Sequence, residues 1–336
     1  MEITDTNCVE KLLKRKVPNG LTPRQLLSYS EIYQKFYRKY NFSVETSCET
    51  HPWLSLVKNQ QYKTNYCTQL FAYWSAQIIN QLPEIPPPDW PKNVEMLNEF
   101  TFDKNIQISK HYYNNALDKT IQYWSAQLIN ETMAHNGTSD FSKMQLLDRI
   151  HLNDVQEAIV IGPNLPWIEA FLITRGVKRV TSVRRSKIEI DPGEKRISTL
   201  SFRELASTSK NNDKILLQYD LVAIFSTLQF AGLGRYGDVV NAFADVFAMQ
   251  ISWCSLKPGG IAVVALPVGI DFLNWNAYRI YGPLRLPMLT AGFRVVDVLF
   301  EGNLKRKYKK QFDIESWIFE HSLGNYVESV IVLEKL

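Results

Sequence analysis

Residues 255–269 have the sequence SLKPGGIAVVALPVG. A helix is expected to end at Leu256, and the turn Lys-Pro-Gly-Gly then leads into the apolar, β-branched run 260–267. A strand without polar alternation is typical of a parallel sheet, because helices cover both faces of such a sheet. The segment therefore predicts the step from a helix to a buried strand in an α/β domain.

The same pattern extends from about residue 156 to the end of the chain. We predict strands at 157–162, 179–184, 196–201, 219–226, 260–267, 293–300 and 326–334, and helices at 166–175, 202–208, 239–256 and 284–291. The last two strands have no strong crossover helix between them, which favours an antiparallel final pair. The expected fold class is α/β with a seven-strand sheet.

Residues 1–155 are rich in Tyr, Trp, Asn and Gln and show helical spacing in several places. A chain of 336 residues is long enough for two domains of ordinary size. We therefore predict a mostly helical N-terminal region, 1–155, followed by the α/β domain, 156–336. The proline-rich stretch 82–92 is expected to be an extended connector.

A near-repeat lies in the N-terminal region, where YWSAQIINQ at 73–81 returns as YWSAQLINE at 123–131. In the first copy one helix stripe would contain Phe71, Trp74, Ile78 and Leu82. Each copy is thus predicted to be a helix with one buried face. A helical-repeat interaction protein is the weaker alternative, because two copies are fewer than a solenoid needs. That alternative would leave Trp74 and Trp124 accessible for a protein partner.

The charges are nearly balanced, with 38 basic and 34 acidic residues and a net charge of +4. This balance gives no strong nucleic-acid signal. The basic run KRKYKK at 305–310 is expected to be a solvated loop. No apolar run is long enough to span a membrane, and the N-terminus has no apolar signal region, so a cytoplasmic location is expected.

The four cysteines, Cys8, Cys48, Cys67 and Cys254, lie far apart without a paired motif. We expect free thiols, with no metal site and no disulfide framework. Three Asn-x-Ser/Thr sequons begin at Asn41, Asn130 and Asn136, and they matter only in a secretory compartment.

GLGRYG at 232–237 matches the dinucleotide fingerprint G-x-G-x-x-G. The fingerprint requires a strand directly before the first glycine and an acid at the end of the next strand. Here TLQFA separates the glycine from the preceding strand, and the next strand ends at Pro267. A dinucleotide site is therefore not expected, and the glycines serve either a tight loop or close approach to a ligand.

Four stretches together resemble a known family: IGPNLPWIEAFLITRGVKRVTSV, GLGRYGD, LKPGG and the following PVGIDFLNWNAYRIYGPLRLPML. The chain resembles the DUF268 family of methyltransferase-like proteins over about 156–300, and the step before 260–267 is similar to that of class I S-adenosylmethionine-dependent methyltransferases. The resemblance implies a Rossmann-like fold with S-adenosylmethionine as cofactor. It also implies a helix N-terminus near residue 166 that faces the cofactor.

The resemblance and the expected strand ends give two sets of candidate residues. The cofactor set is Gly162, Pro163, Asn164, Trp167, Arg184, Thr227 and Gln229. The substrate set is Gly232, Gly234, Arg235, Asp238, Asp271 and Arg279. Alternatives stay open: Trp167 as a packing residue, Asp238 as the N-cap of helix 239–256, and both arginines in structural ion pairs.

The chain departs from the family pattern at positions that could carry chemistry. Arg184 and Arg185 stand where relatives have an acid that accepts the ribose hydroxyls; arginine has only donors. Gln229 and Phe230 replace Glu-His, and Tyr278 replaces His. Two hypotheses follow: a methyltransferase for a small-molecule or glycan-type acceptor, or a pseudoenzyme acting as a binding module. The first requires a cofactor-sized pocket, whereas the second expects Arg184 or Phe230 to fill it.

Overall fold

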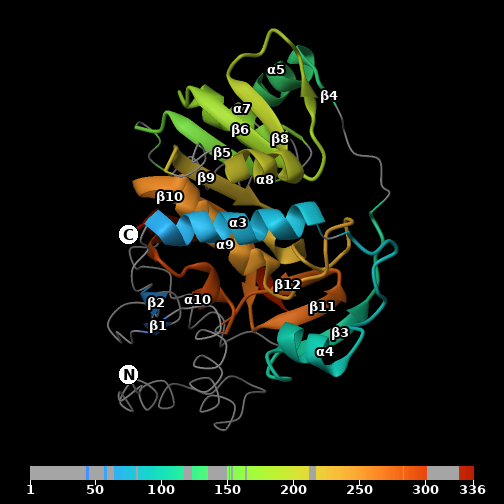
Figure 1. The fold of residues 1–336 in the computed structure, drawn as a ribbon. Helices are drawn as coiled ribbons and strands as arrows, with labels where there is room; N and C mark the ends of the chain where they lie inside the picture. The colour runs from blue at the N-terminus through green and yellow to red at the C-terminus, as the bar shows by residue number, and fades with distance from the viewer. Residues whose placement is uncertain are drawn as a thin grey trace.

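The computed structural model describes residues 43–44, 57–58, 64–80, 82–116, 123–134, 150, 152, 154–162, 165–211, 217–282, 284–300 and 325–336. Its centre is a seven-stranded sheet (Figure 1). The strands are β5 (Glu157–Ile161), β6 (Arg179–Arg184), β8 (Ile197–Ser201), β9 (Tyr219–Phe225), β10 (Leu256–Gly269), β13 (Phe293–Phe300) and β14 (Tyr326–Lys335). All seven predicted strands of the α/β region are confirmed.

The order across the sheet is β13-β14-β10-β9-β5-β6-β8. Neighbours from β10 to β8 are parallel, whereas β14 runs antiparallel to both β10 and β13. The predicted antiparallel final pair is therefore confirmed. The first strand of the sheet, β5, lies near its centre, and the single antiparallel strand, β14, lies between β10 and the edge strand β13. This is the class I methyltransferase-like arrangement expected from the sequence.

Helices cover both faces of the sheet. One face packs against α3 (Thr64–Asn80), α8 (Phe202–Asn211), α9 (Ala244–Ser255) and α10 (Leu286–Leu289); the other packs against α5 (Ala126–Ala134) and α7 (Trp167–Thr174). Successive residues of β10 contribute to opposite cores, as the alternation of a strand requires: Ala262 and Val264 to the first, Val263 and Ala265 to the second. This double burial explains the continuous apolar run.

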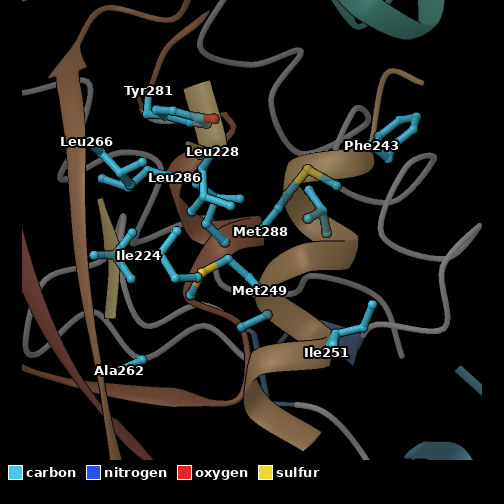
Figure 2. Packing of buried hydrophobic residues seen from close by; sticks show 14 of the residues in the cluster. Ile224, Leu228, Phe243, Met249, Ile251, Ala262, Leu266, Tyr281, Leu286 and Met288 are labelled. Atoms are coloured by element: carbon cyan, nitrogen blue, oxygen red, sulfur yellow. The ribbon is translucent and has the colours of Figure 1, made fainter. Parts of the chain in front are cut away.

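Figure 2 shows the packing in the first core, which lies between the sheet and the helices α3, α8, α9 and α10. Met249 of α9 and Leu228 of the 3-10 helix η1 (Leu228–Phe230) lie against Ile224 and Leu266 of the central strands, with Met288 of α10 beside them. All of these side chains are buried. The core thus ties the strands near the carboxyl edge of the sheet to the helices that follow them.

Residues from the N-terminal region form part of the same structure. The strand β3 (Gln107–His111) pairs in parallel with β11 (Phe272–Asn276), which pairs with β12 (Tyr278–Ile280). The amide of Asn276 donates to the carbonyl oxygen of Tyr113 and accepts from its N–H, both at 2.8 Å. The sequence patterns missed β11 and β12.

The remaining elements are short. They are α4 (Val94–Thr101), β1 (Ser43–Val44) paired with β2 (Val57–Lys58), and β4 (Tyr123–Trp124) paired with β7 (Glu189–Ile190). Residues 82–92 contain no helix or strand, as predicted for the connector. Within the described parts of the chain, no helix is both long and apolar enough to cross a bilayer. The division at residue 155 stays a prediction.

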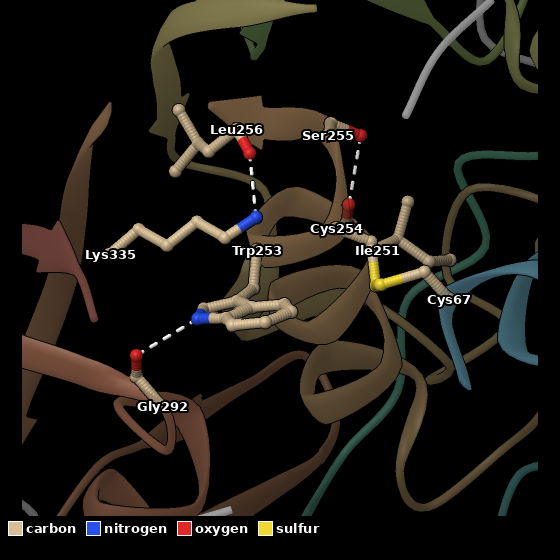
Figure 3. The surroundings of a disulfide bond; sticks show 8 residues. All are labelled: Cys67, Ile251, Trp253, Cys254, Ser255, Leu256, Gly292 and Lys335. Atoms are coloured by element: carbon tan, nitrogen blue, oxygen red, sulfur yellow. Dashed lines mark hydrogen bonds between the residues drawn. A yellow bond between two sulfur atoms is a disulfide. The ribbon is translucent and has the colours of Figure 1, made fainter. Parts of the chain in front are cut away.

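The expectation of free thiols is wrong for two cysteines. Cys67 of α3 and Cys254 of α9 form a disulfide, with Cα atoms 5.6 Å apart across a sequence separation of 187 residues (Figure 3). The two helices pack side by side on the sheet, and this contact brings together cysteines that no spacing motif connects. Cys8, Cys48 and the run 305–310 lie outside the described residues.

The two copies of the near-repeat fold differently. Residues 73–80 of the first copy lie within α3, but the second copy begins as β4 and becomes helical only at Ala126, so the prediction that each copy is a helix is wrong for the second. Ser75 donates its hydroxyl to the carbonyl oxygen of Ala206, whereas the Ser125 hydroxyl accepts from Leu128 N and caps α5. Tertiary contacts therefore decide the conformation of identical residues.

The aromatic residues of the repeat and the end of its stripe also differ from expectation. Trp124 is fully buried and Trp74 is partly buried, while Leu82 is 83% exposed and lies beyond the end of α3. The predicted helical stripe therefore stops before Leu82. With Trp124 inside the core, the repeat does not form the accessible aromatic groove that a repeat interaction protein needs.

Candidate functional site

A cavity of about 610 Å³ lies at the carboxyl edge of β5, β6 and β9, beneath α3. This is the edge at which open α/β sheets bind ligands. The lining residues come from the sheet edge, α3, α9 and the glycine loop; they are Trp74, Gln77, Ile78, Asn115, Ile161, Gly162, Val183, Arg184, Arg185, Phe202, Ile224, Ser226, Thr227, Leu228, Phe230, Ala231, Gly232, Tyr236, Asp238, Val239, Asn241, Ala244, Phe247 and Ala248.

The wall of the cavity is mostly apolar, with a few polar and charged residues. Gly162, directly after β5, is part of the lining, and an added Cβ there would lie 3.1 Å from the carbonyl oxygen of Phe225. Thr227, two residues after the end of β9, also lines the cavity and donates its hydroxyl to Phe225 O at 2.9 Å. The size and apolar character fit a small organic ligand.

Arg184, the last residue of β6, does not extend into this space. Its Nη2 atom donates to Oε1 of Glu169 at 2.5 Å, and its Nη1 atom donates to the carbonyl oxygens of Val160 and Val183. The guanidinium also lies over the ring of Trp124, 5.5 Å from its centroid. Arg184 is thus committed to the α7 face of the sheet.

Arg185 closes one side of the cavity. Its Nη1 atom donates to Ala116 O at 3.0 Å and to Tyr236 O. The side chain therefore joins the segment before residue 117 to the glycine loop. Neither arginine provides the acceptor that ribose hydroxyls need, so no carboxylate takes that role at the end of β6.

The glycine loop 232–237 forms a tight, backbone-packed turn. Gly232 has φ +72°, and a Cβ there would lie 2.0 Å from Asn241 O. Gly234 and Gly237 also have positive φ, and their neighbours include Pro87 and Ala116 of the N-terminal region. The helix α9 does not begin until Ala244, which agrees with the prediction that the loop is not a dinucleotide fingerprint.

Asp238 lines the cavity and is held by its own loop. Its carboxylate accepts from the N–H groups of Gly234 and Tyr236, each at 3.3 Å. Burial raises the pKa of this carboxyl, and the backbone N–H groups lower it less. The alternative role of Asp238 as a helix cap is wrong, because α9 begins six residues later with Phe243 as N-cap.

Arg235 is not part of the cavity lining, and its guanidinium lies among three aromatic rings. Its guanidinium lies 4.4 Å from the ring centroid of Tyr113, with the rings of Phe230 and Tyr236 at 5.2 and 5.0 Å. Its Nε atom donates to Asn115 Oδ1 at 2.8 Å. These contacts fasten the N-terminal segment over the glycine loop.

Asp245 follows the cavity-lining Ala244 in α9 and lies at the centre of a buried ionic network. Arg285 donates to both of its carboxylate oxygens at 2.7 and 2.8 Å, and Tyr281 donates its hydroxyl at 3.0 Å. Burial opposes the charge on Asp245, but the guanidiniums of Arg285 and Arg279 hold its pKa below the usual range. Arg279 also donates to the carbonyl oxygen of Ala231, the residue directly before the glycine loop.

Asp271 organises a separate turn. Its carboxylate accepts from the N–H groups of Gly282, Leu284 and Arg285 at 2.7–3.1 Å. Burial raises its pKa to about 6, although these N–H groups favour the charged form.

The comparisons with known proteins are consistent with this architecture. A family model described as "Caenorhabditis protein of unknown function, DUF268" matches residues 155–336, which is more than half of the chain. The chain belongs to the DUF268 family. No protein with a curated description matches it.

Solved structures similar to this DUF268 protein include methyltransferases. An S-adenosylmethionine dependent methyltransferase from Mesorhizobium loti is 10% identical, with 58% of this chain and 98% of that chain covered and a TM-score of 0.36. The N-methyltransferase NodS from Bradyrhizobium japonicum WM9 is 13% identical, with 59% and 98% covered and a TM-score of 0.33. Because these scores are low, the fold assignment depends on the strand order and the family match.

The candidate residues of the DUF268 protein separate into three groups. The cavity is lined by Gly162, Arg184, Thr227, Gly232 and Asp238. Other candidates lie outside its lining: Trp167, Gln229, Gly234, Arg235, Asp271 and Arg279. Pro163 and Asn164 lie outside the described residues. The binding roles stay predictions, and Trp167 packs edge-on against Phe225 at 5.3 Å between centroids.

Sequence patterns missed the residues of α3 that cover the cavity, namely Trp74, Gln77 and Ile78. The helical stripe places Trp74 and Ile78 on one face of α3, but it does not reveal what that face covers. Among the described residues there is no group of three His, Cys, Asp or Glu side chains that could hold a metal.

Proposed function

We propose that this DUF268 protein binds S-adenosylmethionine and methylates a small, largely apolar acceptor. The single observation that carries the proposal is the 610 Å³ cavity at the carboxyl edge of the first strand, β5. Its volume lies within the range of small-ligand pockets. Arg184 is turned into an ion pair and does not fill it, which supports the methyltransferase over the pseudoenzyme.

The lining fits some parts of the cofactor better than others. Val183, Leu228 and Phe202 offer apolar surface for a purine ring, and Gly162 contributes backbone atoms to the wall. The ribose has no acidic partner at the end of β6, so its hydroxyls would need other acceptors. When bound, S-adenosylmethionine supplies an electrophilic methyl group.

Asp238 is the residue that we assign to the acceptor. Of the described residues that line the cavity, it is the sole carboxylic acid. A carboxyl with a raised pKa in an apolar cavity is suited to take the proton that an acceptor hydroxyl or amine loses. Phe230, Tyr236 and Phe247 surround the same space and would exclude water.

Calorimetry with S-adenosylmethionine and S-adenosylhomocysteine tests cofactor binding. Ala248→Trp places a large ring on a cavity-lining position of α9, whereas Val296→Trp, on an exposed position of β13, is the matched control. We expect micromolar binding by the wild type and by Val296→Trp, and at least a tenfold loss for Ala248→Trp. Equal binding by both variants would place the ligand elsewhere.

The role of Asp238 is tested with methyl-labelled S-adenosylmethionine and the small-molecule fraction of the source tissue. We expect Asp238→Asn to bind the cofactor with unchanged affinity but to transfer less than a tenth of the label. If Asp238→Asn lost both cofactor binding and methyl transfer, the contacts of Asp238 with Gly234 N and Tyr236 N would have a structural role instead.

A binding module without catalysis is the second candidate. The observation that favours it is the absence of a carboxylate at the end of β6, where both arginines are engaged in other contacts. Arg184→Glu alone would bring two carboxylates together in a buried site, so it is combined with Glu169→Gln. Cofactor binding by this double variant, but not by the wild type, would favour the binding module.

A further inference from the structure

The disulfide between Cys67 and Cys254 indicates where the chain matures. Both side chains are buried, at 7% and 0% exposure, and the bond joins two helices of the main core. Disulfides of this structural kind persist in oxidising compartments such as the secretory pathway, whereas reductants keep cytosolic thiols free. The bond therefore makes the sequons of this chain relevant.

The sequon Asn130-Glu131-Thr132 lies on α5, within the described structure. The side chain of Asn130 is exposed, while the adjacent Ile129 is 1% exposed and anchors α5 in the second core. The helix thus fixes the Asn130 amide on its solvent side. Asn41 and Asn136 lie outside the described residues.

The position of α5 separates Asn130 from the cavity. It packs on the α7 face of the sheet, whereas α3 lies on the opposite face (Figure 1). The cavity lies beneath α3. A glycan on Asn130 would point away from both the cavity and the disulfide. The modification is therefore compatible with ligand binding.

We propose that the chain matures in the secretory pathway and carries an N-linked glycan on Asn130. The Asn130 amide nitrogen bonds to the anomeric carbon of a polyprenyl-pyrophosphate-linked oligosaccharide and loses one proton, while the sugar-phosphate bond breaks and the polyprenyl pyrophosphate leaves. The Cys67 and Cys254 thiols lose two protons and two electrons to a disulfide donor, which becomes a dithiol. Any S-adenosylmethionine used by the cavity must then enter the same compartment.

The test isolates the endogenous chain from its source tissue, with free thiols alkylated at lysis. Peptide-N-glycosidase treatment in ¹⁸O water converts a glycosylated Asn130 to labelled Asp, and peptide mass spectrometry detects it together with the linked Cys67 and Cys254 peptides. We expect both signals. An unlabelled Asn130 overturns the glycan, and alkylated Cys67 and Cys254 overturn the secretory assignment.

Matched variants separate the modification from folding. Thr132→Ser keeps the sequon, Thr132→Ala removes it, and Asn130→Gln removes the acceptor amide. When the full chain is expressed in the source organism, we expect a glycosidase-sensitive mobility shift at this site for the wild type and Thr132→Ser, and its loss for the other two. An unchanged shift in Asn130→Gln would overturn the proposal, whatever the state of Asn41 and Asn136.

Discussion

Arg184 and Glu169 form an ion pair in the interior of the protein, with Nη2 and Oε1 2.5 Å apart and exposures of 4% and 0%. Arg184→Met leaves the Glu169 carboxylate unpaired, so we expect a loss of about 3–5 kcal/mol in the free energy of unfolding. Adding Glu169→Gln removes that charge and keeps an acceptor for Ser182. Urea unfolding should show that the double variant recovers most of the loss; equal losses would mean that the charge is not the cause.

The backbone of the glycine loop admits no side chain at Gly232. Gly232→Ala would bring Cβ to 2.0 Å from Asn241 O, in addition to the strain of φ +72°. Gly259→Ala is the matched control, because it has φ +73° and no atom within 4 Å of the added Cβ. We expect about 1–2 kcal/mol of destabilisation for Gly259→Ala and clearly more for Gly232→Ala in urea unfolding. Similar losses would contradict the contact with Asn241.

The titration of Asp271 should lower stability as pH rises. Its pKa is raised from 3.8 to about 6 in the folded chain, so between pH 4 and 6 the folded state binds a proton that the unfolded state has released. The free energy of unfolding therefore falls through this window, by on the order of 2–3 kcal/mol. Asp271→Asn cannot titrate, so its destabilisation relative to wild type should be largest near pH 4. Urea unfolding at pH 4 and 7 checks this, and a pH-independent difference would refute it.

Loss of the disulfide should lower stability without changing the fold. Because it closes a loop of 187 residues, we expect Cys67→Ala with Cys254→Ala to cost roughly 3–5 kcal/mol. Dithiothreitol should produce a similar loss in the wild type and no further loss in the double variant. A wild type that is insensitive to reductant under unfolding conditions would contradict the prediction.

The strands of the α/β region could be predicted from sequence because their burial on both faces leaves continuous apolar runs. Residues 179–184 and 293–300 were predicted with the bounds that the structure has. The strand β11 was missed because its partner is β3, about 165 residues earlier, and local sequence does not encode that pairing. Local sequence likewise does not encode the burial of Trp124 or the pairing of Cys67 with Cys254.

Long-range contacts also limited the prediction of the site. The sequence placed Gly162, Thr227 and Gly232 near a ligand edge, and the structure brings them to one cavity. The sequence did not indicate that Arg184 pairs with Glu169, since the side chain of a strand residue can point to either face of the sheet. The cover of the cavity by α3 depends on packing that only the folded chain contains.

The pairing of β3 with β11 determines which fragments of this protein are worth expressing. A fragment limited to residues 155–336 would leave β11 with an unpaired edge and Cys254 without its partner. It would also expose the apolar side chains that now face Leu70, Phe71 and Phe100. Exposed edges and apolar patches promote aggregation. The family-matched region is therefore a poor choice for crystallisation or for screening ligands, and a fragment meant to keep the cavity has to include α3, which contributes Trp74, Gln77 and Ile78 to its lining.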